Sequence, residues 1–313
     1  MRNLHLASIL ITGGRGFIGA ALAENLRAAG HAVRVLDNRT DAAGPGDPAG
    51  VEFVQGSVGD ASVLATAFAD IDRCVHLAGT PVLENPRAHL AEASAPFLAA
   101  VEPLFAAAAR DGVPVIYASS AAVYGEAADL PIAETAPRHP VTAHGLEKLS
   151  LETCAAQYAE RRDLPSLGLR MFNVYGPGQN LASPYCGVVR RFADKVLNGG
   201  SAVIYGGGSH TRDFVYVDDV VDAFVGLLDI PLQGADVVNV CTGRATEIRD
   251  LAGILETVSG RSLDLRFEGD PETEVASSVG DPTKAGDRYG IEARVSIEEG
   301  AGRMVEALQS SAA

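Results

Sequence analysis

The chain has 313 residues, enough for one large domain or for one domain with a smaller lobe. Its formal net charge is −15, so we expect binding neither to nucleic acid nor to an anionic membrane surface. The four cysteines and seven histidines show no zinc-ligand spacing, and free thiols without a bound metal are expected. The first apolar run, 9–11, is too short for a signal peptide or a membrane span, which predicts a soluble, cytoplasmic protein.

The first half of the chain alternates between short apolar runs and helical stretches. Such alternation predicts a parallel sheet with helices on both faces, an α/β fold of the Rossmann-type doubly wound class. Strands are expected over 8–12, 32–36, 51–54, 74–77 and 113–118, and helices over 20–29, 61–69, 88–110 and 142–162.

The pattern becomes irregular after about residue 170, where glycine-rich loops interrupt it. Asp218 is expected to cap a helix over 219–229, and Thr246 is expected to cap a later one. These features predict a smaller C-terminal lobe over 171–313, with some segments returning to the first domain. Such a lobe would cover the carboxyl ends of the strands, where open α/β sheets bind ligands.

A glycine-rich loop from Thr12 to Gly19 follows the first strand and opens the first helix. Its glycines have the spacing that lets a backbone approach a pyrophosphate at a helix N-terminus. Asp37 ends the second strand, where a carboxylate accepts hydrogen bonds from the adenosine ribose and repels a 2′-phosphate. We therefore expect 1–170 to be an NAD-binding domain, while the nearby Arg39 leaves NADP as an alternative.

Six segments in chain order resemble the extended short-chain dehydrogenase/reductase group, in particular the NAD-dependent epimerase/dehydratase family. The resemblance spans most of the chain and is far more specific for the family than for the reaction. It implies an NAD-dependent enzyme acting on a nucleotide sugar. The segments are TGGRGFIG at 12–19, HLAG at 76–79, SSAAVYG at 119–125, RMFNVYGPG at 170–178, TRDFVYVDD at 211–219 and DPTKA at 281–285.

The resemblance, together with the strand ends, implies a set of cofactor contacts. Ser57 and Val58 are expected to flank the adenine, and the HLAG segment to pass close to the cofactor. The expected contacts are Gly13, Gly16, Phe17, Ile18, Gly19, Asp37, Asn38, Ser57, Val58, Leu77, Ala78, Gly79, Lys148, Phe172 and Val174.

In this family a serine or threonine, a tyrosine and a lysine carry the chemistry. The serine corresponds to Ser120 and the lysine to Lys148, but His144 stands where the tyrosine is expected. Because Lys148 follows His144 by four residues, the two lie on one face of the predicted helix.

His144 leaves three interpretations open. Neighbouring positive charge would keep the imidazole neutral, so it could accept a proton from a sugar hydroxyl. An imidazole is, however, shorter than a phenol by roughly 2 Å, and such a misplacement can cost about 10²-fold. His144 is therefore the acid/base group, or it only positions substrate in a changed chemistry, or the site is inactive.

The pair that follows Ser120 bears on the reaction. Relatives that dehydrate sugars carry Asp-Glu there and decarboxylases commonly carry Glu, whereas this chain has Ala121 and Ala122. The resemblance therefore favours an isomerase, a 4-epimerase of a UDP- or dTDP-hexose, in which a hydride leaves C4 and returns to the other face of a transient 4-keto sugar. The alternatives are a 4-ketoreductase, an atypical dehydratase using His144, or an NAD-binding protein with a degraded site.

Substrate contacts and assembly follow from the same resemblance. Asn173 and Arg212 are expected to bind the substrate, and the long helices near 88–110 and 142–162 to form a homodimer interface. Two departures accompany His144: Ser94 stands where relatives place a helix asparagine near the active site, and 270–274 lacks the arginine that relatives use against the diphosphate.

Overall fold

The computed structural model describes residues 6–39, 49–79, 90–183, 186–205, 207–269 and 275–312. No helix among them is long and apolar enough to cross a membrane. The expected assignment of 1–170 to NAD and of 171–313 mainly to substrate stays a prediction. The chain divides into two compact units, each described by itself: Met1–Val123, Pro140–Arg170 and Val221–Val238 form the first, and Tyr124–His139, Met171–Val220 and Asn239–Ala313 form the second.

A seven-stranded parallel sheet forms the centre of the first unit, in the order β11-β6-β5-β4-β1-β2-β3. β1 and β4 are neighbours, so the chain winds outward from this pair in both directions, which confirms the predicted doubly wound Rossmann-type fold. The strands are β1 (Ser8–Thr12), β2 (Ala32–Asp37), β3 (Glu52–Gln55), β4 (Arg73–His76), β5 (Val115–Ser120), β6 (Ser166–Met171) and β11 (Ala235–Val240).

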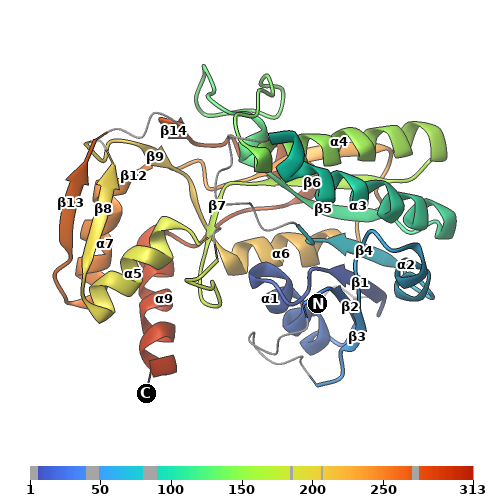
Figure 1. Cartoon of the computed structure of the whole chain (residues 1–313), viewed down its shortest axis with the longest axis horizontal. Coiled ribbons are helices and arrows are strands. Elements are labelled where there is room, and N and C mark those ends of the chain that lie inside the picture. Colours follow the sequence, from blue (N-terminus) through green and yellow to red (C-terminus); the bar gives the residue numbers. More distant parts are fainter. Residues whose placement is uncertain are drawn as a thin grey trace. The chain divides into compact units, whose positions relative to one another are not determined.

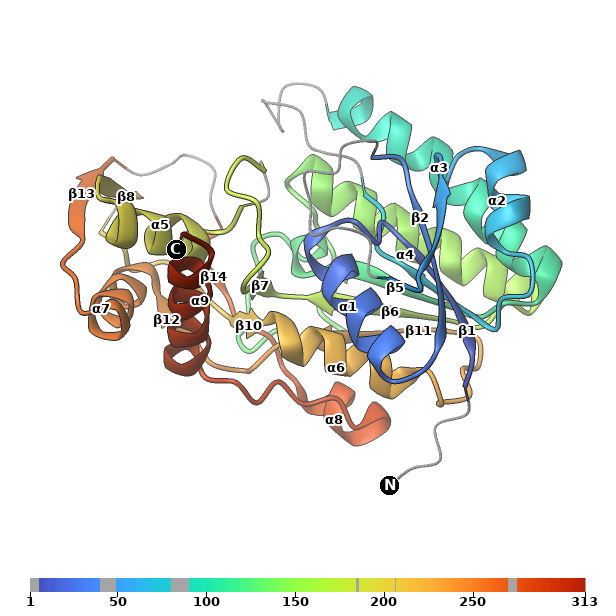
Figure 2. The same cartoon turned by 90° about the horizontal axis from the view of Figure 1, so that it is seen from below.

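Helices cover both faces of this sheet (Figures 1 and 2). One face carries α1 (Phe17–Ala28) and α6 (Val217–Leu227), and the other carries α2 (Ala61–Ala67), α3 (Leu90–Asp111) and α4 (Ala143–Arg162). Helices on both faces follow from the right-handed crossovers that join parallel strands.

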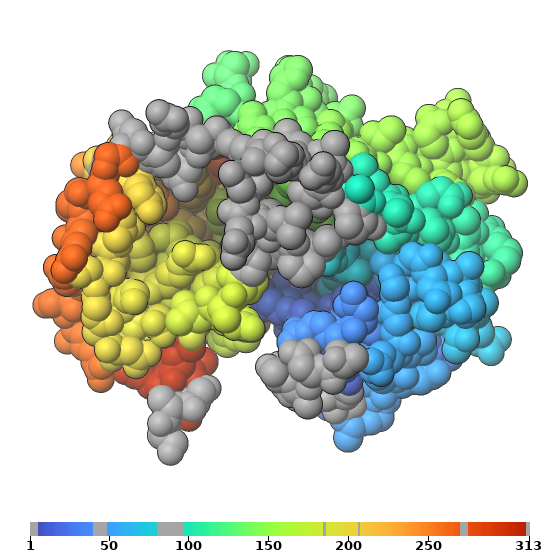
Figure 3. Space-filling view, viewed as in Figure 1, coloured from blue at the N-terminus to red at the C-terminus, as the bar shows by residue number. Residues whose placement is uncertain are grey.

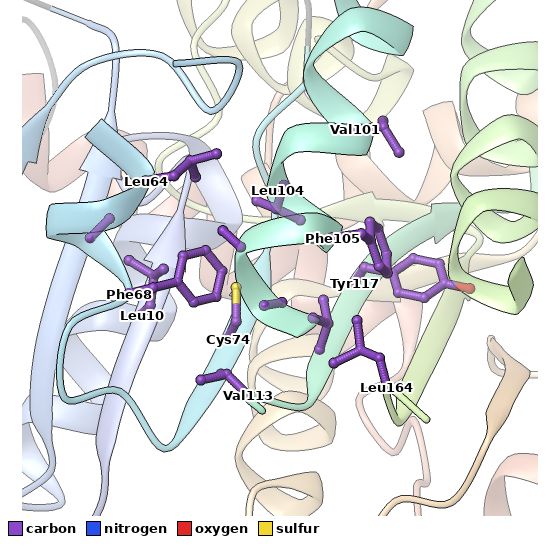
Figure 4. Close-up of a cluster of buried hydrophobic side chains, with 14 of the residues drawn as sticks. Leu10, Leu64, Phe68, Cys74, Val101, Leu104, Phe105, Val113, Tyr117 and Leu164 are labelled. Carbon is purple, nitrogen blue, oxygen red and sulfur yellow. The ribbon is translucent and has the colours of Figure 1, made fainter. Parts of the chain in front are cut away.

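The main core of the first unit lies between the sheet and the helices α2, α3 and α4 (Figure 4). The sheet contributes Leu10 and Cys74 to this core, and Phe68 contributes from the C-terminal end of α2. The Phe105 ring of α3 meets the ring of Tyr117 edge-on, with the centroids 6.2 Å apart. Truncating such a core aromatic costs about 3–5 kcal/mol, so the burial of these rings contributes substantially to the stability.

Helix α2 is capped at both ends by side chains. Asp60 accepts hydrogen bonds from the Ser62 hydroxyl, at 2.7 Å, and from the backbone N–H groups of Ser62 and Val63, at 2.8 and 3.4 Å, and these bonds lower the pKa of its carboxyl. Arg34 of β2 donates to three carbonyl oxygens at the end of the helix, at 2.6 to 3.3 Å. These contacts satisfy backbone groups that a seven-residue helix leaves without partners.

A buried ion pair joins α4 to the neighbouring strands. The Arg170 guanidinium of β6 donates to both carboxylate oxygens of Glu152 at 2.8 Å, and the two side chains are each 2% exposed. Ser119 of β5 donates to the same carboxylate at 2.6 Å. The bidentate geometry and the added hydroxyl compensate for the loss of solvation that burial imposes on both charges.

The second unit, in its described residues, contains small sheets and four helices. Strands β8 and β13 pair in parallel and lie side by side at its surface, in yellow and orange in Figure 3. The elements are β7 (Asn173–Tyr175) with β10 (Phe214–Tyr216), β8 (Ser201–Tyr205) with β13 (Asp264–Glu268), β9 (Thr211–Arg212) with β12 (Thr246–Glu247) and β14 (Ser277–Ser278), and α5 (Val188–Asn198), α7 (Ile248–Ser259), α8 (Thr283–Tyr289) and α9 (Ile297–Ala312).

Asp213 joins three segments of the second unit. Its fully buried carboxylate accepts hydrogen bonds from the N–H and hydroxyl of Thr242, at 2.8 and 2.7 Å, and from the N–H of Gly243, at 2.9 Å. The N–H of Gly280 adds a fourth at 3.3 Å. A buried carboxylate with several such donors can remain charged without a basic side chain.

Two expected helix caps were wrong. Asp218 lies inside the first turn of α6 and pairs with Arg303 at 3.3 Å. Thr246 lies in β12, where it pairs with Arg212, so its backbone is extended and α7 begins after Glu247. The pairing of Thr246 with a distant segment therefore moves the start of α7 beyond the locally favoured residue.

We predict that Arg170→Met lowers the free energy of unfolding by about 3–5 kcal/mol, because it leaves the Glu152 carboxylate buried without its cation. Urea unfolding of the purified protein measures this change. Arg294→Met, which removes the exposed partner of Glu292, serves as the control and is expected to change it little. Equal effects of the two substitutions would contradict the structural role of the buried pair.

Candidate active site

The loop between β1 and α1 depends on glycine at the positions where backbone segments approach each other closely. Gly13 has φ +72°, and a Cβ there would lie 2.7 Å from the backbone nitrogen of Ala78. A Cβ at Gly19 would lie 2.3 Å from the carbonyl oxygen of Gly13. Gly16 precedes α1 without a side-chain cap, so the first N–H groups of the helix can face an anion. This cradle fits a pyrophosphate.

Asp37 closes the same loop from β2. Its carboxylate accepts hydrogen bonds from the backbone nitrogens of Arg15, at 2.9 Å, and Arg39, at 3.0 Å, and it is 7% exposed. The Arg15 guanidinium lies 3.6 Å from the ring centroid of Phe53. Asp37 therefore orders the glycine loop in addition to the predicted contact with a ribose.

The loop that follows β4 is tied to the end of β1. The N–H of Leu77 donates to the carbonyl of Thr12 at 3.0 Å, and the N–H of Ala78 donates to the Thr12 hydroxyl at 3.3 Å. After β3, the Ser57 hydroxyl accepts from the N–H of Gly59 at 3.1 Å. The expected contacts at 13–19, 37–38, 57–58 and 77–79 thus follow β1, β2, β3 and β4 at the carboxyl edge of the sheet.

The expected catalytic residues meet where α4 packs on the end of β5. Ser120 ends β5, and its hydroxyl accepts from the N–H of Ala122 at 3.2 Å. A Cβ at Gly145 would lie 2.4 Å from the Ala122 carbonyl oxygen, so only glycine lets the first turn of α4 approach this closely. His144 precedes this glycine, and Lys148 follows one turn later. The structure therefore brings the two α4 residues to the segment that carries Ser120.

Burial controls the charges on this part of α4. It lowers the pKa of His144 to about 3, and the nearby Lys148 ammonium adds to the effect. Burial also lowers the pKa of Lys148 to about 8, against the opposing charge of Glu147. Burial raises the pKa of Glu147 to about 7. Near neutral pH the imidazole is uncharged and the lysine is mostly protonated.

The remaining expected residues belong to the second unit. Phe172 is buried, and its N–H donates to Val240 at 3.1 Å. Asn173 and Val174 lie in β7, and the Asn173 side chain is exposed. Arg212 of β9 donates to the carbonyls of its neighbour and of Ala276, at 2.9 and 3.4 Å.

Sequence reasoning missed three residues of this region: Arg15, His76 and Glu147. His76 stands in the HLAG segment and Glu147 precedes Lys148, so both were visible as unusual titratable residues, but their burial was not. The two departures cannot be placed, because the side chain of Ser94 and residues 270–274 fall outside the described part of the structure.

The doubly wound sheet, the glycine cradle and Asp37 define a dinucleotide-binding enzyme. Residues 9–241 match the profile of the NAD dependent epimerase/dehydratase family. The chain belongs to this family, and its cofactor is NAD.

Relatives and solved structures match the chain over almost its whole length. A putative UDP-glucose 4-epimerase of Methanocaldococcus jannaschii is 30% identical, covering 97% of this chain and 99% of the relative. The UDP-glucose 4-epimerase of Thermotoga maritima, solved with UDP-glucose, has a TM-score of 0.90 at 30% identity, covering 98% and 100% of the two chains. That of Thermus thermophilus, solved with NAD, has a TM-score of 0.88 at 28% identity, covering 97% and 99%. Other relatives are named as dehydratases and decarboxylases.

We predict that Asp37→Ala weakens NAD binding about tenfold and reduces the preference for NAD over NADP. The substitution removes the charge that repels a 2′-phosphate and frees the N–H groups of the glycine loop. Calorimetric titration with both cofactors measures the two affinities. Asp72→Ala is the control: it removes a carboxylate that binds the amino end of β1, away from the glycine loop, and should leave both affinities unchanged. An unaltered NAD/NADP ratio in Asp37→Ala would refute the assignment.

Proposed function

We propose that the chain is a nucleotide-sugar 4-epimerase that acts on a UDP- or dTDP-hexose through a transient 4-keto sugar. The observation that carries this proposal is the segment after Ser120. There η1 (Ala121–Val123) holds two alanines where an elimination would need an acid and a base. Epimerisation at C4 needs one proton acceptor that later returns the proton. The full-length similarity to UDP-glucose 4-epimerases supports the same reaction.

The proposed roles follow from the placement of the residues. NAD, when bound, supplies the acceptor for the hydride from C4 and returns it. The Ser120 hydroxyl orients the sugar hydroxyl by hydrogen bonding, and neutral His144 accepts its proton as the C4 carbonyl forms. Lys148 binds the nicotinamide ribose and keeps positive charge beside it. The glycine cradle, Asp37, Asn38, Ser57, Val58 and the 77–79 loop hold the rest of the cofactor, with Phe172 and Val174.

Proton return is favoured by the charge of Lys148. When His144 takes the proton it becomes a cation close to an ammonium, and burial makes that cation still less stable. The imidazolium therefore gives its proton back readily as the hydride returns to C4. The balance closes within one turnover, because O4 regains the proton and C4 regains the hydride that each had lost.

The second unit is proposed to select the substrate and the first to bind NAD. Asn173 and Arg212 supply an amide and a guanidinium for the nucleotide-sugar, the latter suited to its diphosphate. We also propose a homodimer through α3 and α4, which pack side by side in the first unit and expose Leu98 to 39%.

A dehydratase is the second candidate, because of Glu147. This buried carboxyl has a pKa raised to about 7 and lies beside Lys148, so it could exchange a proton near neutral pH. Its presence favours a reaction that removes water after oxidation at C4. Formation of a 4-keto-6-deoxy sugar from a dTDP- or UDP-hexose would replace the epimerase proposal.

We predict that His144→Ala lowers kcat for interconversion of UDP-glucose and UDP-galactose by about 10²–10⁴-fold while NAD binding is retained. Chromatography of the two sugar nucleotides measures the rate, and calorimetry measures NAD affinity. The exposed His139 of the second unit provides the control variant, His139→Ala, which should keep full activity. Higher activity in His144→Tyr than in the natural protein would show instead that His144 is a lesion.

We predict that kcat/KM falls above about pH 8, where Lys148 loses its proton, and that His144 causes no loss between about pH 5 and 7. Because the Glu147 charge raises the pKa of Lys148, Glu147→Gln should move the alkaline limb to lower pH. The pH profiles of the two proteins test this directly. An alkaline limb that stays in place would contradict the coupling.

A further inference from the structure

His76 is a buried imidazole without an assigned role. It ends β4, is 2% exposed, and its Nδ1 lies 2.7 Å from the Thr12 hydroxyl. Among the residues that the structure describes, its Nε2 is buried and has no hydrogen-bond partner. A buried polar atom without a partner costs free energy, and such an atom next to a site is a functional candidate.

Lys148, in turn, has hydrogen-bond donors that lack an acceptor among the described residues. Its ammonium carries three donors and the residue is 7% exposed, yet in the described part of the chain no group accepts a hydrogen bond from it. Its Nζ instead lies 5.3 Å from the ring centroid of Phe97 on α3. Lys148 is also close enough to His76 to disfavour protonation of that ring, which burial already opposes.

The Nε2 of His76, unpartnered among the described residues, and the nearby Lys148 ammonium favour one tautomer of the imidazole. If Nε2 carried the hydrogen, a buried N–H dipole would lie close to the ammonium with its positive end unpaired. If Nδ1 carries it, Nδ1–H donates to the Thr12 hydroxyl and Nε2 offers a lone pair. Positive charge nearby favours the second arrangement.

We propose that His76 is a positioning residue of the active site, in which the Nε2 lone pair is the acceptor for the Lys148 ammonium. Through Nδ1 it links that ammonium to Thr12, the residue directly before the glycine cradle. No hydrogen bond joins His76 and Lys148 in the described structure, so the contact requires a rotation of the flexible lysine stem. The link would couple the placement of the ammonium to the β1 and β4 loops that hold the cofactor.

Four groups act on the Lys148 ammonium in the described part of the first unit. Glu147 and His144 lie on its own helix, His76 lies on β4, and the Phe97 ring lies on α3. Among these, the carboxylate of Glu147 raises the lysine pKa. A lone pair on His76 would do the same, whereas an apolar ring in its place would not.

The chain suits a direct test because it has three lysines, Lys148, Lys195 and Lys284. Isotope-labelled lysine in the full-length, NAD-saturated protein gives three side-chain NMR signals, and Lys148→Arg identifies one of them. His76→Phe removes the proposed acceptor and keeps a ring. His31→Phe is the matched control, because His31 is also buried, also bonds through Nδ1, and also has an unpartnered Nε2 among the described residues.

We expect the Lys148 titration midpoint to fall by about one pH unit in His76→Phe, since a hydrogen bond to a charged group is lost. His31→Phe should leave the Lys148 midpoint unchanged. His76→Gln retains an acceptor, so its Lys148 midpoint should stay close to that of the natural protein. Nitrogen NMR of labelled histidine should show the hydrogen of His76 on Nδ1.

A purely structural role for His76 would lower stability or NAD affinity without moving the Lys148 midpoint, and that result would overturn the proposal. A hydrogen on Nε2 would overturn it too, as would an equal shift in His31→Phe. If His76→Phe does not fold, Thr12→Val replaces it, because the loss of the Thr12 hydroxyl removes what directs the tautomer. Thr12→Val should lower the midpoint in the same direction, and an unmoved midpoint would refute the link.

Discussion

The geometry of the candidate site depends on the buried ion pair between Arg170 and Glu152. Glu152 lies on α4, one turn beyond Lys148, and its two partners lie on β5 and β6. The pair therefore fixes how α4 sits against the sheet. Since β5 ends at Ser120, the same contact sets the position of the lysine relative to the serine. A buried ion pair contributes little net stability compared with apolar packing, but it accepts few alternative arrangements.

The sequence predicted the parts of this arrangement that are local. The limits of β1 and the glycine cradle follow from neighbouring residues, because an apolar run must end where glycine begins and only glycine fits the turn. The contact between Arg170 and Glu152 spans 18 residues and two elements, so no local pattern indicates it. The strands β6 and β11 were missed for a similar reason: they complete a sheet whose earlier strands alone show the regular alternation.

A phenol and an imidazole respond differently to the same ammonium. Positive charge lowers the pKa of both, which makes a phenol available as a charged base but makes a neutral imidazole a weaker base. His144 therefore gains nothing from an unscreened Lys148: burial lowers the pKa of the imidazole, and the ammonium lowers it further. The buried Glu147 carboxylate counters the ammonium from the same helix. A site in which histidine replaces tyrosine thus requires groups that reduce the lysine field, and none of these would be needed beside a phenol.

In the described residues of the second unit, a buried carboxylate is stabilised mainly by main-chain N–H donors and not by an ion pair. Asp213 is held by the backbone of Thr242, Gly243 and Gly280, and its own carbonyl accepts the N–H of Asn173. Arg212 precedes it directly in the chain. The proposed substrate contacts therefore belong to a frame built mainly from backbone donors, with the Thr242 hydroxyl as a side-chain donor. Loops around such a frame can change their side chains without loss of the frame.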